Sequence, residues 1–572
     1  MDKIWLQSYP PGVPPEVDLH EFSSLGQLFE RSCQRFRERT AYISMGVGLT
    51  YGELDRQARA FGAYLQQCLK LAPGARIALM MPNLLQYPIC LFGALRAGYT
   101  VVNCNPLYTH RELEHQLGDG EVSAIVIVEN FAHTLEQALP RLPTLKQVIV
   151  TGIGDRLGFP KGPVVNFVLR HGKKMVPPWT IPGARSLNGV LAEGRRHVLQ
   201  GVKVTQEDVA FLQYTGGTTG VAKGAMLTHG NVIANLQQAH AWIAPFLHEG
   251  EEIIVTALPL YHIFALTANC LTFLKIGATN LLIANPRDIP GMVKELGKYR
   301  FTTITGVNTL FNALLNHPDF AQLDFSRLHV TLGGGMAVQK AVALRWKEVT
   351  GRPLIEAYGL TETSPAVTIN PLNLTDYNGA IGLPISSTEV AIRDDRGFDQ
   401  PPGVSGEICV RGPQVMKGYW RRPDETAGVF YPDGFLRTGD VGVMDDQGFV
   451  RIVDRKKDMI LVSGFNVYPN EVEGVVAMLP GVLEVAAVGV PDDRTGEAVM
   501  LFIVPKGPGL TREAVLAHCR ENLTAYKVPR RVEFRQELPR TNVGKILRRA
   551  LKEEALAACH QTPAGEGKQA TA

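Results

Sequence analysis

The 572-residue chain has little cysteine, and none of it stands in a metal-binding or redox pattern. The eight cysteines are scattered singly, with no C-x-x-C pair among them. This spacing argues against the common zinc motifs and against a disulfide framework. We therefore expect buried free thiols in a reducing compartment.

Charge of one sign and long apolar runs are also lacking. A net charge of +3 is too small to indicate nucleic-acid binding and leaves room only for a local basic patch. The first eighteen residues contain no apolar core of signal-peptide length. The most membrane-like stretch, residues 253–274, is interrupted by Pro259, His262 and Asn269, which disfavours a transmembrane span. The sequence favours a cytoplasmic protein.

Glycine, by contrast, is concentrated in one stretch, YTGGTTGVAKGAMLTHGN at residues 214–231. Glycines let the backbone approach a ligand closely, so that successive N–H groups can converge on one anion. Threonine hydroxyls and Lys223 add donors and a positive charge, which suits the oxygens of a nucleotide polyphosphate. The Walker pattern G-x-x-x-x-G-K-[ST] is absent, because Ala222 precedes the lysine and Gly224 follows it. On composition alone, a flexible surface loop is the alternative.

The length and the order of apolar runs indicate an α/β fold with more than one domain, since 572 residues exceed what one hydrophobic core supports. Residues 75–106 form a strand–helix–strand pattern, which implies a parallel sheet. A second series of β-rich runs follows the glycine-rich stretch, and ligands of such folds bind outside the carboxyl ends of the strands. From about Ile381 the pattern changes to short strands and turns, and after Asp454 to a compact α+β segment.

We therefore predict a large N-terminal domain of two doubly wound α/β subdomains plus a small β-rich module, followed by a small mobile α+β C-terminal domain. The N-terminal domain spans residues 1–453 and the C-terminal domain residues 454–559. Residues 560–572, rich in glycine, alanine, threonine and glutamine, form a disordered tail in this prediction.

The glycine-rich stretch resembles the signature of the adenylate-forming superfamily, which includes acyl-CoA synthetases, luciferases and peptide-synthetase adenylation domains. Further matches follow in the family's order: PLYHIF at 259–264, GGGM at 333–336, YGLTE at 358–362, DGFLRTGDVGVMDDQGFVRIVDRKKD at 433–458, SGFNVYPNEVE at 463–473 and PRTNVGKILRR at 539–549. The resemblance covers nearly the whole chain and is greatest to bacterial long-chain fatty acyl-CoA synthetases. It also makes residues 253–274 a buried strand and helix.

The resemblance implies an ATP- and Mg²⁺-dependent ligase. Such an enzyme converts a long-chain fatty acid to an acyl-adenylate with release of pyrophosphate, and then forms a thioester with coenzyme A. A synthetase for medium-chain or aromatic acids, or a ligase that loads a carrier protein, is the alternative within the superfamily. The chain has no carrier-like segment after the small domain, which favours free coenzyme A. A non-catalytic nucleotide sensor is the alternative from another class, and intact Lys545, Glu362 and Asp440 argue against it.

The resemblance also implies a role for each motif residue. Lys545 would bridge the carboxylate and the α-phosphate in the adenylation transition state, Thr361 would contact that phosphate, and Lys223 would hold the outer phosphates. Glu362 would bind Mg²⁺, with Thr218 as a weaker second ligand. The nucleotide-binding residues would be Tyr214, Thr215, Gly216, Gly217, Thr218, Thr219, Gly220, Gly334, Gly335, Tyr358, Gly359, Asp440 and Arg455. Taken alone, Glu362, Tyr358 and Lys545 would more readily be interpreted as a helix-capping or surface carboxylate, a core tyrosine and a helix-surface lysine.

Three further assignments follow from the resemblance. Asp440 would take the ribose hydroxyls, and Asp454 would be the hinge between two orientations of the C-terminal domain. After rotation, Ser463, Gly464 and Phe465 would line the pantetheine tunnel. His262, Val307 and Gly333 would line the acyl tunnel, for which ordinary core packing is the alternative. The stretch YHIFAL lacks the aspartate of amino-acid-activating relatives, which disfavours amino-acid substrates. Gly216 replaces a serine that many relatives carry, which removes one hydroxyl donor but keeps the backbone N–H.

Residues 164–179, VVNFVLRHGKKMVPPW, interleave Arg170, Lys173 and Lys174 with large apolar side chains. This pattern suits an anionic bilayer surface, and a loop between domains is the alternative. We therefore expect a cytoplasmic enzyme with peripheral contact to the inner face of the cytoplasmic membrane. A homodimer also remains open, and no nucleic-acid partner is expected.

Overall fold

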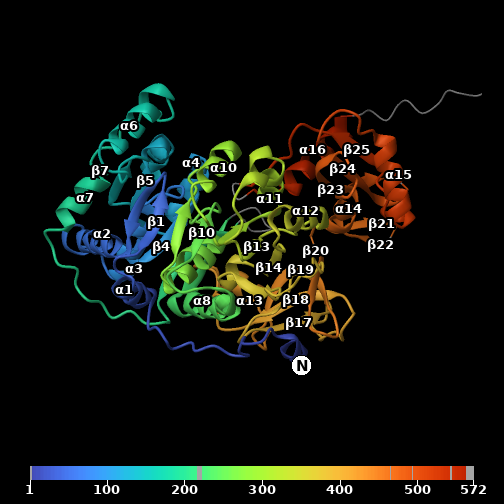
Figure 1. Ribbon diagram of the computed structural model, residues 1–572, viewed down its shortest axis with the longest axis horizontal. Helices are drawn as coiled ribbons and strands as arrows, with labels where there is room; N and C mark the ends of the chain where they lie inside the picture. The colour runs from blue at the N-terminus through green and yellow to red at the C-terminus, as the bar shows by residue number, and fades with distance from the viewer. Residues whose placement is uncertain are drawn as a thin grey trace, which may run out of the picture.

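The computed structural model describes residues 3–215, 222–455, 457–463, 465–492, 494–541 and 544–561, except the side chains of residues 558–561. Figure 1 shows an elongated molecule, with the α/β sheets at one end and in the middle and the C-terminal domain projecting at the other end. This arrangement confirms the predicted fold class.

The first sheet has seven strands in the order β7-β6-β5-β3-β4-β8-β9. Their bounds are β3 Arg76–Met80, β4 Thr100–Cys104, β5 Val122–Val128, β6 Gln147–Thr151, β7 Arg185–Ser186, β8 Val209–Thr215 and β9 Lys223–Thr228. The strand–helix–strand unit predicted at residues 75–106 is confirmed, because β3 and β4 are parallel and helix α3 (Gln86–Arg96) joins them. All residues of α3 are buried, as expected for a helix that is apolar on every side. The glycine-rich stretch begins at the end of β8 and contains β9, which pairs antiparallel with β8.

The second sheet has nine strands in the order β16-β15-β14-β13-β12-β10-β11-β1-β2. Their bounds are β1 Thr40–Ser44, β2 Val47–Thr50, β10 Ile253–Thr256, β11 Thr279–Leu282, β12 Thr303–Gly306, β13 Val330–Gly334, β14 Ile355–Gly359, β15 Ala366–Ile369 and β16 Leu383–Pro384. The five β-rich runs predicted after the glycine-rich stretch are its central parallel strands β10 to β14. Residues 253–274 fold as β10, the π-helix η7 (Ala265–Leu271) and the start of α9 (Thr272–Lys275), as expected.

The β-rich module is a four-stranded antiparallel sheet of β17 (Glu389–Arg393), β18 (Gly406–Arg411), β19 (Leu436–Met444) and β20 (Val450–Arg455). The predicted domain boundary at residue 454 lies inside β20. The C-terminal sheet contains β21 (Ile460–Val462), β22 (Phe465–Val467), β23 (Val482–Asp492), β24 (Gly496–Pro505) and β25 (Arg531–Phe534). The last helix, α16, ends at Gln561, so the first two residues of the predicted tail are helical, and residues 562–572 lie outside the described part.

Helices cover both large sheets and the C-terminal sheet (Figure 1). The remaining α-helices are α1 Leu25–Arg35, α2 Tyr51–Ala63, α4 His110–Asp119, α5 Ala132–Ala138, α6 Lys161–Phe167, α7 Leu187–Gly194, α8 His229–Ile243, α10 Ile289–Leu296, α11 Asn308–Leu315, α12 Lys340–Thr350, α13 Pro423–Val429, α14 Pro469–Ala477, α15 Arg512–Asn522 and α16 Arg548–Gln561. Within the described residues, seven cysteines are free thiols, and no helix is both long and apolar enough to cross a bilayer.

Candidate active site

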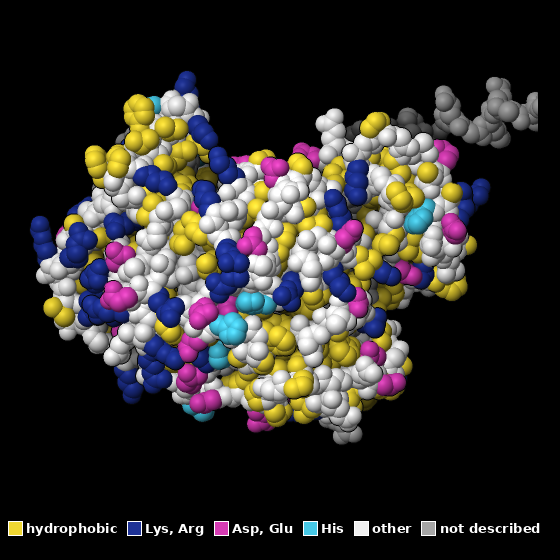
Figure 2. All heavy atoms as spheres, viewed as in Figure 1, with side chains coloured by type: hydrophobic (Ala, Val, Ile, Leu, Met, Phe, Trp, Pro, Cys, Tyr) yellow, Lys and Arg dark blue, Asp and Glu magenta, His cyan; other side chains and the backbone are white. Residues whose placement is uncertain are grey.

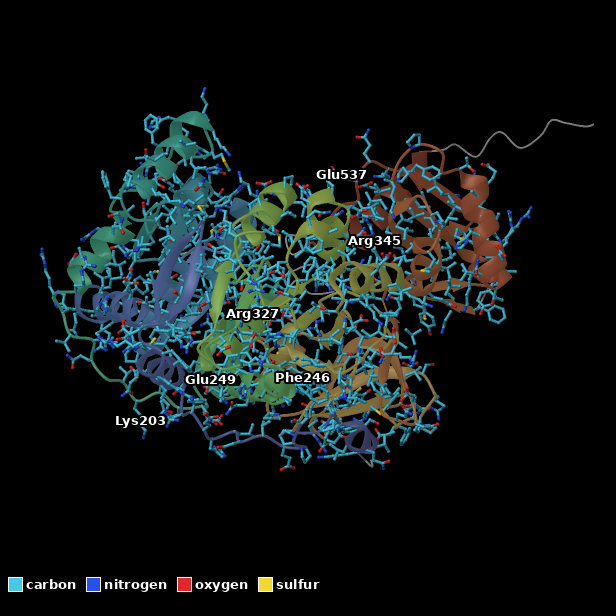
Figure 3. The ribbon with its side chains drawn as sticks, in the orientation of Figure 1. Lys203, Phe246, Glu249, Arg327, Arg345 and Glu537 are labelled. Carbon is cyan, nitrogen blue, oxygen red and sulfur yellow. The ribbon has the colours of Figure 1, made fainter. Side chains whose placement is uncertain are left out.

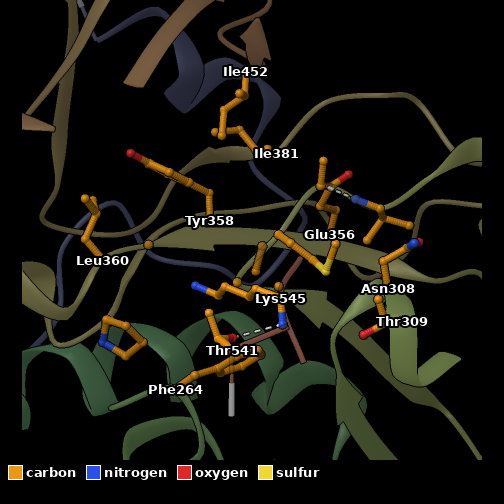
Figure 4. Close-up of a pocket in the computed structure, with 18 of the residues that line it drawn as sticks. Phe264, Asn308, Thr309, Glu356, Tyr358, Leu360, Ile381, Ile452, Thr541 and Lys545 are labelled. Atoms are coloured by element: carbon orange, nitrogen blue, oxygen red, sulfur yellow. Dashed lines mark hydrogen bonds between the residues drawn. The ribbon is translucent and has the colours of Figure 1, made fainter. Parts of the chain in front are cut away.

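A cavity of about 1890 Å³ lies where the carboxyl ends of β12, β13 and β14 face the C-terminal domain. Figure 4 shows Lys545 and Thr541 entering it beside Tyr358 and Phe264. The predicted site residues that line it are Tyr214, Thr215, His262, Gly334, Gly335, Tyr358, Gly359, Thr361, Glu362, Asp440, Arg455 and Lys545. Residues spread over more than three hundred positions of sequence therefore meet in one space.

Other predicted site residues do not line this cavity. Val307 and Gly333 lie beside it, and Val307 packs between Gly335 and Gly544. Ser463 and Phe465 lie on the C-terminal domain, where the Phe465 ring is 57% exposed and stacks on Tyr526 at 4.8 Å between ring centroids. The predicted site residues that lie outside the described residues are Gly216, Gly217, Thr218, Thr219, Gly220 and Gly464.

Lys545 reaches the cavity on the loop before α16. The Thr541 N–H donates to the Lys545 carbonyl at 2.7 Å, and the Lys545 N–H donates to Thr541 Oγ1 at 3.1 Å. This turn rests on the N-terminal domain, because the Thr309 hydroxyl donates to the Gly544 carbonyl at 2.9 Å. Burial, with the positive charge of Arg455, lowers the pKa of Lys545 to about 8. An anion beside the ammonium would oppose that shift, so the site favours a negatively charged ligand.

His262 faces the same ammonium from the N-terminal domain. Burial and the charge of Lys545 lower the pKa of His262 to about 3. The imidazole is therefore neutral at physiological pH and adds no charge to the cavity.

Asp440 is held in place from two sides. The Tyr358 hydroxyl donates to Asp440 Oδ2 at 2.7 Å, and Arg455 Nε lies 3.3 Å from Asp440 Oδ1. Burial and the neighbouring carboxylate raise the pKa of Tyr358 well above its usual value, so the phenol stays protonated as a donor. The tyrosine, aspartate and arginine thus form one polar wall of the cavity.

Glu362 and Lys223 are linked through a residue that the sequence analysis did not single out. The Tyr419 hydroxyl donates to Glu362 Oε1 at 2.8 Å, and Lys223 Nζ lies 5.3 Å from the centre of the Tyr419 ring. Lys223 also forms an ion pair with Glu425 on α13. No motif around Tyr419 predicts this link, because its partner is 57 residues away in sequence.

A magnesium site with several protein ligands is not present among the described residues, which contain no cluster of three metal-binding side chains. Mg²⁺ bound to a nucleotide needs only one or two carboxylates, since phosphate oxygens and water supply the other ligands. Glu362 lines the cavity as a single carboxylate of this kind. The donor set therefore fits Mg²⁺ delivered with a polyphosphate.

Two glycines are required by close packing at the site. A Cβ on Gly359 would lie 1.9 Å from the Pro365 carbonyl oxygen, which no side chain can tolerate. Gly335 has φ +77°, and a Cβ there would lie 3.3 Å from Cε of Lys545. Both positions let backbone approach the centre of the cavity closely.

An apolar branch of the cavity extends away from the charged groups, between α8 and the second sheet. Its wall on α8 consists of Asn235, Ala239 and Ile243, which recur every four residues and so share one helix face. Ala268, on the π-helix η7, lines the branch from another side. We did not identify the α8 wall of this branch from the sequence, because α8 is apolar on most sides and resembles an ordinary core helix.

A buried carboxyl in the cavity was also missed. Glu356 lies two residues before Tyr358 on β14, so both side chains share one face of the strand. Its Oε1 accepts the Val338 N–H at 3.0 Å, as the dashed line in Figure 4 shows. Burial raises the pKa of Glu356 to about 8. A glutamate within a strand gives no sequence signal of this kind, since burial decides it.

Asp454, the predicted hinge residue, is fully buried on β20. It accepts the N–H groups of Arg455 at 2.7 Å and Asn470 at 2.9 Å, and Arg548 Nη1 lies 3.6 Å from its Oδ1. Burial raises the pKa of Asp454 to about 6. Glu473 also pairs with Arg548, at 2.5 Å. Residue 454 therefore joins the β-rich module to α14 and α16.

The AMP-binding enzyme family model matches residues 29–420, and the model of the AMP-binding enzyme C-terminal domain matches residues 471–545. The chain belongs to the AMP-binding enzyme family. The resemblance noted in the sequence is thereby confirmed, and the cavity described above joins the two matched regions.

Named relatives span the chain almost completely. A long-chain-fatty-acid–CoA ligase of Escherichia coli O6:H1 is 59% identical over 97% of this chain and 99% of its own length. The Bacillus subtilis protein of the same name is 39% identical over 96% of this chain and 98% of its own length.

Solved structures agree with the family. The anthranilate CoA ligase AuaEII in complex with anthranoyl-AMP has a TM-score of 0.84 at 25% identity, covering 95% of this chain and all of its own. ATP-bound MatB from Rhodopseudomonas palustris has a TM-score of 0.79 at 27% identity, covering 92% of this chain and 98% of its own.

Proposed function

We propose that this protein is an AMP-forming long-chain-fatty-acid–CoA ligase. The observation that carries the proposal is the cavity itself, where Lys545, Glu362 and Asp440 meet at the head of an apolar branch. Full-length relatives with that name, at 54% to 59% identity, support the same activity. The substrates are ATP, a fatty acid and coenzyme A.

In the first half-reaction, a fatty-acid carboxylate oxygen attacks the α-phosphorus of ATP and pyrophosphate leaves. The Lys545 ammonium, on a flexible stem, bridges the carboxylate and the α-phosphate and stabilises the charge that develops between them. Thr361 contacts the same phosphate, and Lys223 exchanges Glu425 for the departing pyrophosphate. Asp440 accepts the ribose hydroxyls. Mg²⁺, held by Glu362, would neutralise phosphate charge.

In the second half-reaction, the coenzyme A thiolate attacks the acyl carbonyl and AMP leaves. Lys545 occupies the cavity, whereas Ser463 and Phe465 lie away from it, as expected for the adenylating arrangement. We infer that rotation at Asp454 exchanges these two faces. The exposed Phe465 then covers the pantetheine arm, so one cavity serves both reactions in turn.

The apolar branch holds the acyl chain in this proposal. Its position between α8 and the second sheet differs from the acyl tunnel assigned to Val307 and Gly333, neither of which lines the cavity. His262 lies at the cavity head, where a neutral imidazole does not compete with Lys545 for the carboxylate.

The test measures the formation of pyrophosphate and AMP from ATP with acids of increasing chain length, with and without coenzyme A. Long-chain acids should yield pyrophosphate in both cases, and AMP together with acyl-CoA only when coenzyme A is present. AMP without acyl-CoA would redirect the second half-reaction to another acceptor. ADP as the product, or no turnover with any acid, would overturn the proposal.

A peripheral membrane contact is the second part of this proposal. Helix α6 and the π-helix η5 (Val168–Gly172) project from one end of the molecule, and Figure 2 shows apolar and basic side chains gathered on that tip. The exposed large apolar side chains there are Phe159, Val164, Phe167, Val168 and Met175, with Phe159 92% exposed. Lys173 and Lys174 lie beside them and are exposed. An apolar tip with basic neighbours suits an anionic bilayer.

The contact surface is narrower than residues 164–179 suggest. Arg170 pairs with buried Glu129 at 2.6 Å, and Trp179 is half-buried against the first sheet. Phe159, which precedes the predicted segment, is exposed at the tip, whereas Arg170 and Trp179 are not part of the contact surface. The surface that would meet lipid therefore consists of α6, η5 and the residues just before α6.

Sedimentation with phosphatidylglycerol vesicles tests the contact. Burial of one phenylalanine side chain is worth about 1.5–3 kcal/mol, so the double variant Phe159→Ser/Phe167→Ser should bind at least about tenfold more weakly. Lys173→Glu/Lys174→Glu should reduce binding at low salt, since each lysine near the surface contributes about 1 kcal/mol. Phe398→Ser, 67% exposed on the β-rich module, is the matched control and should bind normally. Unchanged binding by both double variants would refute the contact.

A further inference from the structure

The apolar branch of the active-site cavity ends deep in the N-terminal domain. Gly334 lies at the nucleotide end of β13 and Val330 at the other end, and both line the cavity. Four residues of strand span about 13 Å. On α8, Asn235 and Ile243 line the branch eight residues apart, which corresponds to about 12 Å along the helix. The two estimates agree that the branch continues well past the reacting groups.

Ile243 and Phe273 stand at the deep end of this branch. Both line the cavity, yet only 7% of Ile243 and 3% of Phe273 is exposed. They belong to one apolar cluster with Val330 and Ile369, which also line the branch. The end of the branch is therefore closed by packed side chains.

A second pocket, of about 540 Å³, lies on the other side of this closure. It is lined by His240, Ala244 and Leu247 at the end of α8 and beyond, by Lys275 at the end of α9 and Ile276 after it, and by Glu21, Phe22, Arg31, Ser32, Arg35, Phe36 and Glu249. Figure 3 labels Glu249, one of these lining residues, and Phe246 from the segment that follows α8.

Sequence neighbours on α8 separate the two spaces. Ala239 and Ile243 face the apolar branch, while His240 and Ala244 face the second pocket. After η7, Phe273 lines the branch and Ile276, three residues on, lines the second pocket, and both belong to one apolar cluster. One layer of side chains thus divides an apolar space from an open, charged one.

The second pocket is unsuited to an alkyl chain. Arg35 pairs with Glu249 at 2.5 Å, and Lys275 pairs with Glu21 at 2.9 Å. Burial and the charge of Lys275 lower the pKa of His240 to about 4, so the imidazole is neutral. Displacing hydration from paired charges to admit methylene groups is unfavourable. The methyl end of a bound chain would therefore stop at the closure.

We propose that Ile243 and Phe273 form a seal between the acyl branch and this second pocket, and that the seal sets the longest acyl chain the enzyme accepts. The inference rests on the proposed fatty-acid activity and on the placement of the acyl chain in this branch. Chains that end before the seal are accepted at full rate, and each further methylene must push into close-packed side chains.

The test measures kcat/KM for AMP formation with saturated acids from medium to very long chain. Ile243→Ala removes three carbon atoms from the seal and should raise the upper limit by about two to four carbons. Ala239→Phe places a ring across the branch about 6 Å nearer the nucleotide, four residues before Ile243 on the helix, and should lower the limit. Beyond each limit, one methylene should cost about tenfold or more. Ala244→Phe adds the same ring on the second-pocket side and should leave the limit unchanged.

Each outcome decides between the inference and the function on which it rests. Opposite shifts by Ile243→Ala and Ala239→Phe, with none by Ala244→Phe, support the seal. If the wild-type protein activates long chains but both branch variants keep its limit, the seal is wrong and the function stands. If the wild-type protein activates no fatty acid, the proposed function itself fails. Medium-chain activity of each variant reports that it is folded, and Ala239→Phe tests the seal independently if Ile243→Ala is unstable.

Discussion

The ammonium of Lys545 should control how adenylation depends on pH. Burial and Arg455 lower its pKa from 10.5 to about 8 in the absence of nucleotide, which corresponds to about 3 kcal/mol of lost stability of the charged form. Because burial lowers the pKa of this lysine, its charged form is present below pH 8 and is lost as the pH rises above 8. About nine-tenths of the lysine is protonated at pH 7 and about one-tenth at pH 9.

Because kcat/KM reports groups of the free enzyme, kcat/KM for ATP in pyrophosphate exchange should fall about tenfold per pH unit above pH 8. His262 is neutral across this range, and the carboxylates that face Lys545 are Asp440 and Glu362. Arg455→Gln removes a neighbouring positive charge and should move the fall to higher pH. In Lys545→Arg, whose side chain stays charged, kcat/KM should be lower than in the wild-type protein but should not fall with pH.

A fall that persists at the same pH in Lys545→Arg would assign it to another group and refute this reasoning. A wild-type profile without any fall up to pH 9.5 would refute it equally. Measuring coenzyme A acylation from supplied acyl-adenylate gives the control, since Lys545 has no part in that half-reaction and its rate should be the same in Lys545→Arg.

Three further predictions concern the walls of the cavity. Asp440→Asn should lower kcat/KM for ATP by roughly ten- to a hundredfold, because hydrogen bonds to a charged group contribute about 1.5–3 kcal/mol; an unchanged value would remove Asp440 from the nucleotide site. Glu425→Gln should release Lys223 and strengthen inhibition by pyrophosphate up to about fivefold, since a half-exposed ion pair is worth at most about 1 kcal/mol; weaker inhibition would mean that Glu425 assists phosphate binding. Gly359→Ala should lower the free energy of unfolding in urea by about 1–3 kcal/mol through overpacking, whereas Gly428→Ala, with no atom within 4 Å of the added Cβ, should not; equal stability of the two variants would contradict the packing argument.

The fold was predictable from the sequence where periodicity and burial coincide. The runs that became β3, β4 and β10 to β14 are rich in apolar residues and short, and the segment that became α3 is apolar between Gln86 and Arg96. Such segments bury all of their apolar side chains when they form a parallel sheet that helices cover on both faces. The hairpin β1–β2 joins the second sheet at its far edge, a long-range pairing that no local pattern specifies.

The candidate site was predictable where motif residues are close in sequence, as in the stretch around Tyr358 and Glu362. Tyr419, Glu356 and the α8 wall were not predictable, for different reasons. Tyr419 belongs to the site because it donates to Glu362, which is far away in sequence. Glu356 belongs to it because of its burial, and Ala239 because it lines the cavity. Each depends on tertiary placement, which a single sequence does not encode locally.

The strand β20 would couple the nucleotide site to the proposed motion of the C-terminal domain. Its register pairs Val441 with Asp454 and Asp440 with Arg455, so a turn at residue 454 must separate the last rungs of that ladder. Arg455 would then leave Asp440 at the moment Lys545 leaves the cavity. The Arg455–Asp440 ion pair and the thioester-forming arrangement would then exclude each other, while the acyl-adenylate stays in the cavity. Such coupling would order the products in time, because AMP, formed only after the domain turns, would leave a site from which Arg455 has withdrawn.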